Sequence, residues 1–178
     1  MRRLALALTT VVLTVAAGCA TMSVSSHVER GLDFNQYRSF DWGPADELPT
    51  GDPRLDRDPF FKDHVQGAVE KQLAQRGLQL SDSPDLRIHY HAAVTRRVNV
   101  SGVDRERGYC YSNNCHAEVL EYEAGTLVLD FVDTRTNRVI WRGWAQDTVG
   151  KMLDDRDVME RKINEAVTRM LARLPDAL

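Results

Sequence analysis

The residues best suited to chemistry in this sequence are cysteines and the histidines near them. Cys110 and Cys115 are separated by four residues, and His116 follows directly. His89 and His91 stand two positions apart, so on a β-strand both rings would point to the same face. Thiolates and imidazole nitrogens are ligands for zinc or copper, and two neighbouring thiols can also form a disulfide. These residues therefore raise two alternatives, a disulfide and a metal site.

The N-terminal segment predicts export from the cytoplasm. Arg2 and Arg3 form a positively charged start, and the 14 residues from Leu4 to Ala17 are apolar apart from the threonines. This run is too short for a permanent transmembrane helix, which needs about 20 residues. A positive start, a short apolar run and small residues at its end are typical of a secretory signal peptide, which we assign to residues 1–18.

The end of this segment, Ala16-Ala17-Gly18-Cys19, resembles the lipobox of bacterial lipoproteins, with Ala16 at the position where leucine is usual. The resemblance implies that the signal peptide is cleaved before Cys19 and that Cys19 carries the lipid anchoring the mature chain. Ala20 follows the cysteine, and by resemblance to enterobacterial sorting this implies the outer membrane, on the side that faces the periplasm. The alternative is an ordinary signal peptide followed by an incidental cysteine.

Export also favours the disulfide between Cys110 and Cys115, because disulfides form in the oxidising periplasm and the lipobox cysteine is used by the lipid. The enclosed loop is small, so loop-closure entropy predicts a stabilisation of only ~2 kcal/mol. The metal alternative would add His89, His91 and His116 as ligands. These residues match no recognised ligand spacing, so we predict neither a metal nor another cofactor.

Composition and motifs argue against several classes of function. Hydrophobic residues make up 43% of the chain and charged residues 28%, which is ordinary for a folded domain. The formal net charge is -3, and basic pairs such as Arg96 and Arg97 are too short to indicate nucleic-acid binding. The sequence contains no Gly-x-Ser-x-Gly motif, no phosphate-binding glycine-rich loop and no His-Glu-x-x-His motif. We therefore predict that the protein is not an enzyme.

Hydrophobic spacing predicts the elements that must position these residues. The predicted strands are residues 22–28, 37–42, 86–94, 126–133 and 138–146, the last two joined by a turn at 133–137. The predicted helices run from Asp58 to Gly77, and from Asp154 or Asp155 to the residue before Pro175. Residues 98–119, rich in charge, glycine and asparagine, are predicted to form an irregular excursion.

Two amphipathic helices and several half-apolar strands predict one α+β domain over residues 19–178, with a short or absent tether behind the lipid. We expect a two-layer sandwich, in which a largely antiparallel sheet of four to five strands carries the two helices on one face.

Alternation along the strands predicts which side chains face the core. Leu86 and Ile88 would face it, whereas His89 and His91 would point to the opposite side. Large aromatic residues are mostly buried, and this favours core positions for Phe40, Trp42 and Trp141. Trp144 stands on the opposite face from Trp141. The expected interaction surface consists of aromatic residues on this face and in the excursion, namely Trp144, Tyr109 and Tyr111.

Short motifs along the mature chain, taken in their order and spacing, are similar to a known bacterial lipoprotein domain. They are DFNQYRSFDW (33–42), PDL (84–86), GTLVLDFVD (125–133) and VIWRG (139–143). On these motifs the sequence is identified as a member of the family of domain of unknown function 4136. The family has no established activity. The resemblance therefore implies an envelope location and a compact α+β domain, and it supplies no catalytic residues.

We expect a non-enzymatic interaction or structural module of the bacterial cell envelope. Its expected partners are the membrane, through the N-terminal lipid, and envelope proteins or cell-wall material, but not nucleic acid. One alternative is a carrier of a small hydrophobic ligand, which predicts an apolar pocket between sheet and helices. Another is a metal-binding or hydrolytic envelope protein, which predicts titrating groups gathered in a cleft.

Overall fold

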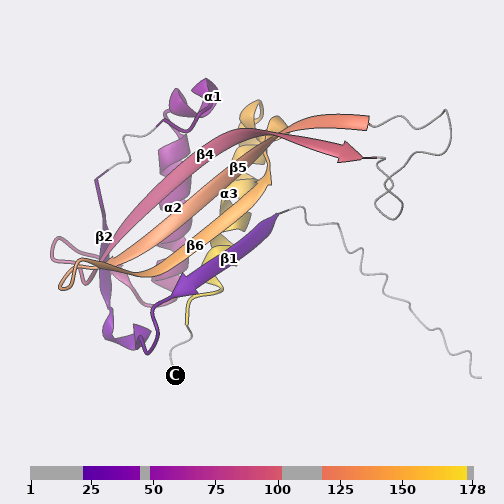
Figure 1. Cartoon of the computed structure of the whole chain (residues 1–178). Helices are drawn as coiled ribbons and strands as arrows, with labels where there is room; N and C mark the ends of the chain where they lie inside the picture. The colour runs from indigo at the N-terminus through magenta and orange to yellow at the C-terminus, as the bar shows by residue number, and fades with distance from the viewer. Residues whose placement is uncertain (1–21, 45–48, 102–117, 176–178) are drawn as a thin grey trace, which may run out of the picture.

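The computed structural model describes residues 22–44, 49–101 and 118–175 (Figure 1). The strands are β1 (Ser23–Val28), β2 (Ser39–Trp42), β3 (Gln79–Leu80), β4 (Leu86–Ser101), β5 (Glu118–Asp133) and β6 (Arg138–Thr148). The α-helices are α1 (Pro53–Asp56), α2 (Phe61–Gln75) and α3 (Arg156–Leu171), and two 3-10 helices lie at Phe34–Gln36 and Gly150–Leu153.

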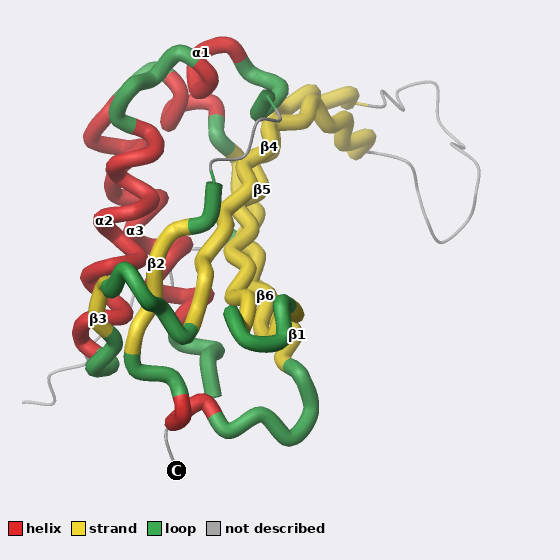
Figure 2. The backbone as a smooth tube through the Cα atoms, turned by 90° about the vertical axis from the view of Figure 1, so that its left-hand side faces the viewer, coloured by secondary structure: helices red, strands yellow, loops and turns green. Residues whose placement is uncertain are grey.

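The chain forms the predicted α+β arrangement of a sheet covered by helices on one face. The strands lie in the order β1-β6-β5-β4-β2-β3, and α2 and α3 lie side by side on the same side of this sheet (Figure 2). The core lies between the two layers. Its fully buried side chains come from both, for example Leu73 and Val167 from the helices and Ile88, Phe131 and Trp141 from the sheet.

The sheet differs from the prediction in having six strands and mixed pairing. β2 runs parallel to both β3 and β4, whereas all the other pairs are antiparallel. The parallel pairs arise because α2 lies between β2 and the strands that follow it, and a helical crossover returns the chain in the same direction. β3 has only two residues, too few to show a hydrophobic period.

The two central strands are also much longer than predicted. β4 continues past residue 94 to Ser101, and β5 begins at Glu118 instead of near residue 126. Pairing continues without a break out to Ser101 and Glu118, so both sides of the predicted irregular excursion are regular strands. We call residues 96–101 and 118–123 the arm. β6 pairs no further than Ala124, so the arm has two strands only. The arm has no core to cover and its strands are rich in charged and polar residues, so apolar alternation is limited to short stretches such as Val98 and Val100.

The helix ends follow local hydrogen bonding. α2 begins at Phe61, later than predicted, because the Asp58 carboxylate accepts a hydrogen bond from the amide of Phe60 (2.8 Å) and holds a separate turn before the helix. Gly77 has a φ of 83° and ends this segment, as predicted. The sequence predicted that the last helix starts at either Asp154 or Asp155. In the structure, Asp155 is the residue that caps α3. None of the described helices is both long and apolar enough to cross a membrane.

The aromatic residues follow the prediction with one exception. Phe40 and Trp141 are buried. Trp42 is only half-buried, and its indole nitrogen donates to Glu70 (2.9 Å) at the edge of the core. A Cβ at Gly143 would lie 2.2 Å from Cη2 of Trp141, so a glycine is required where the indole crosses β6.

Candidate functional site

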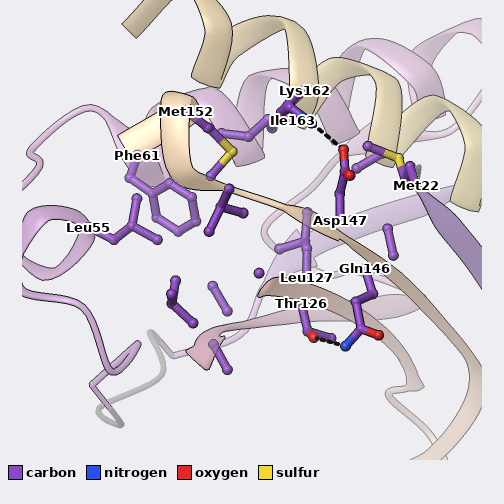
Figure 3. A pocket seen from close by; sticks show the side chains of 17 residues that line it. Met22, Leu55, Phe61, Thr126, Leu127, Gln146, Asp147, Met152, Lys162 and Ile163 are labelled. Atoms are coloured by element: carbon purple, nitrogen blue, oxygen red, sulfur yellow. Dashed lines mark hydrogen bonds and ion pairs between the residues drawn. The ribbon is translucent and has the colours of Figure 1, made fainter. Parts of the chain in front are cut away.

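An apolar pocket lies between the sheet and the helices, at the end of the sheet where β1 begins (Figure 3). Both layers contribute side chains to its wall, including Met22, Leu55, Phe61, Leu127, Met152 and Ile163. Its free volume is about 60 Å³. An engineered cavity that binds benzene has roughly 150 Å³. The pocket is therefore large enough for the end of an apolar group but not for a whole small molecule.

An ion pair lies at the rim of this pocket. The ammonium group of Lys162, on α3, donates to the carboxylate of Asp147, on β6 (Figure 3). Nearby, the side-chain amide of Gln146 donates to the hydroxyl of Thr126 (3.0 Å). Since the two charges of the ion pair neutralise each other, the rim favours an uncharged apolar group over an ionic ligand.

A row of polar side chains crosses the opposite face of the sheet, which no helix covers. His27, Arg142, Asp130 and His89 stand on β1, β6, β5 and β4, each paired in register with the next. The Arg142 guanidinium donates through Nε and Nη2 to the two carboxylate oxygens of Asp130, both at 2.6 Å. Asp130 is buried, and its hydrogen bond raises the pKa of Arg142. This bidentate ion pair ties β5 to β6.

His89 is held in a position that favours its neutral form. Burial is the largest effect and lowers the pKa of His89; the Asp130 carboxylate opposes it, and His91 and Arg87 lower the pKa further by smaller amounts. The ring occupies the space beside Gly43, where an added Cβ would lie 2.1 Å from Cε1 of the imidazole. Packing against β2 explains why His89 is only partly exposed, unlike an ordinary surface histidine.

The structure brings some of the predicted site residues together. His89 and His91 share the uncovered face, as predicted, and His91 lies in the next row with Val128 and Trp144. The Trp144 side chain is exposed. The described residues contain no group of three His, Cys, Asp or Glu side chains arranged to hold a metal ion.

The other predicted site residues, namely Cys19, Tyr109, Cys110, Tyr111, Cys115 and His116, lie outside the described residues. The lipid site, the disulfide and the third histidine of the metal alternative therefore stay predictions.

The sequence analysis did not predict the Asp130–Arg142 ion pair or the Asp147–Lys162 ion pair at the pocket rim. A signal for the first pair exists, because Asp130 interrupts an apolar strand and Arg142 stands in the partner strand of the same predicted hairpin. The sequence carries no such signal for the pair of Asp147 and Lys162, because the angle at which α3 crosses the sheet decides which residue of β6 Lys162 meets.

Several solved structures have a similar fold. A PDZ domain protein from Parabacteroides distasonis superimposes with a TM-score of 0.54 at 16% identity, and the match covers 87% of this chain but only 36% of that protein. A DUF4136 family protein from Bacteroides thetaiotaomicron gives a TM-score of 0.50 at 13% identity, with 84% and 95% of the two chains covered. The PelC dodecamer from Paraburkholderia phytofirmans gives 0.46 at 11% identity, covering 85% and 95%.

At these identities the two superpositions with TM-scores of 0.54 and 0.50 show the fold alone. No curated protein matches this chain. The sequence model of a domain of unknown function, DUF4136, matches residues 24–176, which is nearly the whole chain after the predicted signal peptide. The chain therefore belongs to the DUF4136 family.

Proposed function

We propose that this protein is a lipid-anchored lipoprotein of the bacterial cell envelope, attached through Cys19 and held on the periplasmic side of the outer membrane. The domain acts as a non-enzymatic interaction module, and its partners are envelope proteins or cell-wall material. The observation that carries the proposal is the position of the first described residues relative to the predicted lipid site.

The described domain begins almost directly after Cys19. Met22 is buried, and its carbonyl accepts a hydrogen bond from the Arg169 guanidinium on α3 (3.0 Å). Ser23 is already paired with Gln146 in the sheet. Ser23 stands four positions after Cys19, with three residues in between, and these four steps span at most ~14 Å even when fully extended. A lipid on Cys19 would therefore hold the domain itself against the bilayer, as expected of a module that works at the membrane surface.

Metabolic labelling tests the anchor. We expect the wild-type protein to incorporate a labelled fatty acid and to fractionate with outer membranes. The Cys19→Ser variant should incorporate none, because it lacks the thiol that accepts the lipid, whereas the matched variant Cys110→Ser should be labelled like the wild type. An unlabelled wild-type protein, or label retained in Cys19→Ser, would refute the proposal.

The uncovered sheet face around Trp144 is the surface we expect to meet a partner, because an aromatic side chain exposed on an uncovered face supplies apolar contact area. Photo-crosslinking from position 144 in intact cells tests this surface. Val139 is similarly exposed and lies elsewhere on β6, so position 139 is the control. A defined crosslinked species from position 144 and not from position 139 is expected. Equal crosslinking from both positions would contradict the assignment.

A second candidate function is that of a carrier, because the pocket has the apolar lining that a hydrophobic ligand requires. Its free volume of about 60 Å³ argues against a whole ligand unless Met22 and Met152 move. Native mass spectrometry with added fatty acid tests this function. A stoichiometric complex that is lost in Ala92→Phe, a change that fills the pocket, would favour the carrier over the interaction module.

A further inference from the structure

The start of β1 and the arm lie at the same end of the sheet (Figure 1). Ser23 belongs to a row that continues through Gln146 and Thr126 to Ala93 on β4. From Ala93 the strand continues for eight more residues to Ser101, about 26 Å at the rise of an antiparallel strand. The arm therefore extends well past the level at which the tether leaves the domain.

The tether, which is the stretch between Cys19 and Ser23, reaches less far than the end of the arm. If Cys19 is lipidated, the bilayer surface lies within the ~14 Å that four extended residues can span from Ser23. The opposite end of the sheet cannot face the membrane. Val139, at that end, stands seven residues along β6 from Gln146, the partner of Ser23, which is about 23 Å. This distance exceeds the reach of the tether. The end of the arm at Ser101 lies about 26 Å past Ala93, at the end of the sheet where β1 begins, so the arm is long enough to meet the bilayer.

The described side chains of the arm suit a lipid interface. Val98, Leu120 and Tyr122 are large apolar residues whose side chains are 57%, 49% and 38% exposed. Val98 stands opposite Glu121, so it points to one face of the ribbon while Leu120 and Tyr122 point to the other. With apolar groups on both faces, the arm exposes apolar surface whichever way it is turned, and tyrosine is enriched at membrane–water interfaces.

The charged residues of the arm limit how deeply it can enter. Arg96 and Arg97 lie at its base, where their guanidinium groups could meet lipid phosphates. Glu123 is paired with Arg54 of α1 (2.9 Å), which keeps this carboxylate at the body of the domain. Glu121 stands beside the apolar residues, and a carboxylate does not enter hydrocarbon readily. The contact is therefore shallow, at the level of the lipid head groups, and the arm, which is longer than the tether, lies obliquely against the bilayer.

We propose that the arm is a second, non-covalent membrane contact, which inserts Val98, Leu120 and Tyr122 into the head-group region of the same bilayer that holds the Cys19 lipid. The contact orients the domain so that the opposite end of the sheet, with the turn between β5 and β6, points away from the membrane. This inference rests on the proposed lipid anchor.

Depth-dependent fluorescence quenching tests it on the full lipidated protein. A polarity-sensitive fluorescent amino acid is introduced by codon reassignment at position 120 or, as a control, at position 139, so that the native cysteines are unchanged. The two sites are matched, because Leu120 is 49% and Val139 is 46% exposed. Each protein is reconstituted into vesicles of phosphatidylethanolamine and phosphatidylglycerol, with or without lipids that carry a nitroxide near the head group.

The probe at position 120 is expected to shift its emission to shorter wavelength on vesicles and to lose most of its intensity to the nitroxide lipids, whereas the probe at position 139 should do neither. Equal quenching at the two positions, or quenching at 139 alone, would overturn the orientation. A blue shift at 120 without quenching would show that a protein surface covers the arm and would overturn the membrane contact.

Mass spectrometry of the same samples separates this result from the fate of the anchor. A protein without acyl chains overturns the proposed function together with this inference. A fully acylated protein whose probe at position 120 is neither shifted nor quenched overturns the inference alone and leaves the anchor standing.

Discussion

At the scale of single residues, the carboxylate of Asp133 shows how a buried charge is stabilised. It lies at the end of β5, is 3% exposed, and accepts hydrogen bonds from the Tyr37 hydroxyl (2.8 Å) and from the amides of Arg135 (2.8 Å) and Thr136 (3.0 Å). Burial raises the pKa of Asp133, but the hydrogen bonds lower it by more and hold it at about 2. Burial and the hydrogen bond that the Tyr37 hydroxyl donates to Asp133 raise the pKa of Tyr37 to about 12.

This network predicts acid sensitivity. The pKa of Asp133 falls from 3.8, the value of an unperturbed aspartate, to about 2 in the folded protein. The ionised carboxylate therefore stabilises the fold above pH 3.8, and this contribution, about 2 kcal/mol, is lost as the pH falls toward 2. Urea unfolding at a series of pH values measures the loss.

The variant Tyr37→Phe should weaken this dependence, because it removes one of the hydrogen bonds that lower the pKa of Asp133. We expect its free energy of unfolding at neutral pH to be about 1 kcal/mol lower than that of the wild type, and its further loss in acid to be smaller. Tyr122→Phe, which removes a hydroxyl from an exposed tyrosine, is the control and should change neither value. Identical acid profiles for Tyr37→Phe and the wild type would show that this hydrogen bond does not hold the charge.

At the scale of elements, local sequence predicted most helix and strand positions because their signals are local. The apolar face of strand 86–94 is confirmed, since Leu86 and Ile88 are fully buried while His89 and His91 point away. The length of the arm and the existence of β3 could not be predicted in this way. A strand that buries neither face has no reason to alternate, and a two-residue strand is defined only by the β2 backbone that it meets.

The cap of α3 is an element-scale prediction. Asp155 accepts hydrogen bonds from the amides of Asp157 (3.0 Å) and Val158 (3.1 Å), which have no acceptor inside the helix. Asp155→Ala should therefore reduce the free energy of unfolding by about 1 kcal/mol. Asp154→Ala is the matched control. Asp154 makes only an exposed contact with Arg54 (3.4 Å), worth at most about 0.5 kcal/mol. A larger loss in Asp154→Ala than in Asp155→Ala would reverse the assignment of the cap.

At the scale of the whole molecule, the two layers are joined by apolar packing and by the ion pair between Lys162 and Asp147 at the pocket rim. The side chains of these residues are 28% and 10% exposed. Removing one partner of a fully buried pair costs about 3–5 kcal/mol. For this partly solvated pair we expect Lys162→Met to reduce the free energy of unfolding by roughly 1–3 kcal/mol.

The control for Lys162→Met is Glu165→Gln, also on α3, which removes only the exposed pair with Arg169 and should cost under about 0.5 kcal/mol. Both values come from urea denaturation at neutral pH. Equal effects of the two substitutions would mean that the ion pair at the rim contributes no more to docking of the layers than a surface contact does.

By itself, the sequence determined the family, the α+β class, the faces of the main strands and the approximate position of the last helix. Each of these depends on residues close together in the chain or on their order along it. Only the tertiary structure decided the mixed sheet, the pairing of Arg142 with Asp130, the apolar pocket and the direction of the arm. These features depend on how distant segments cross and on which strand lies beside which. That geometry arises from packing the whole core, and no local pattern of residues encodes it.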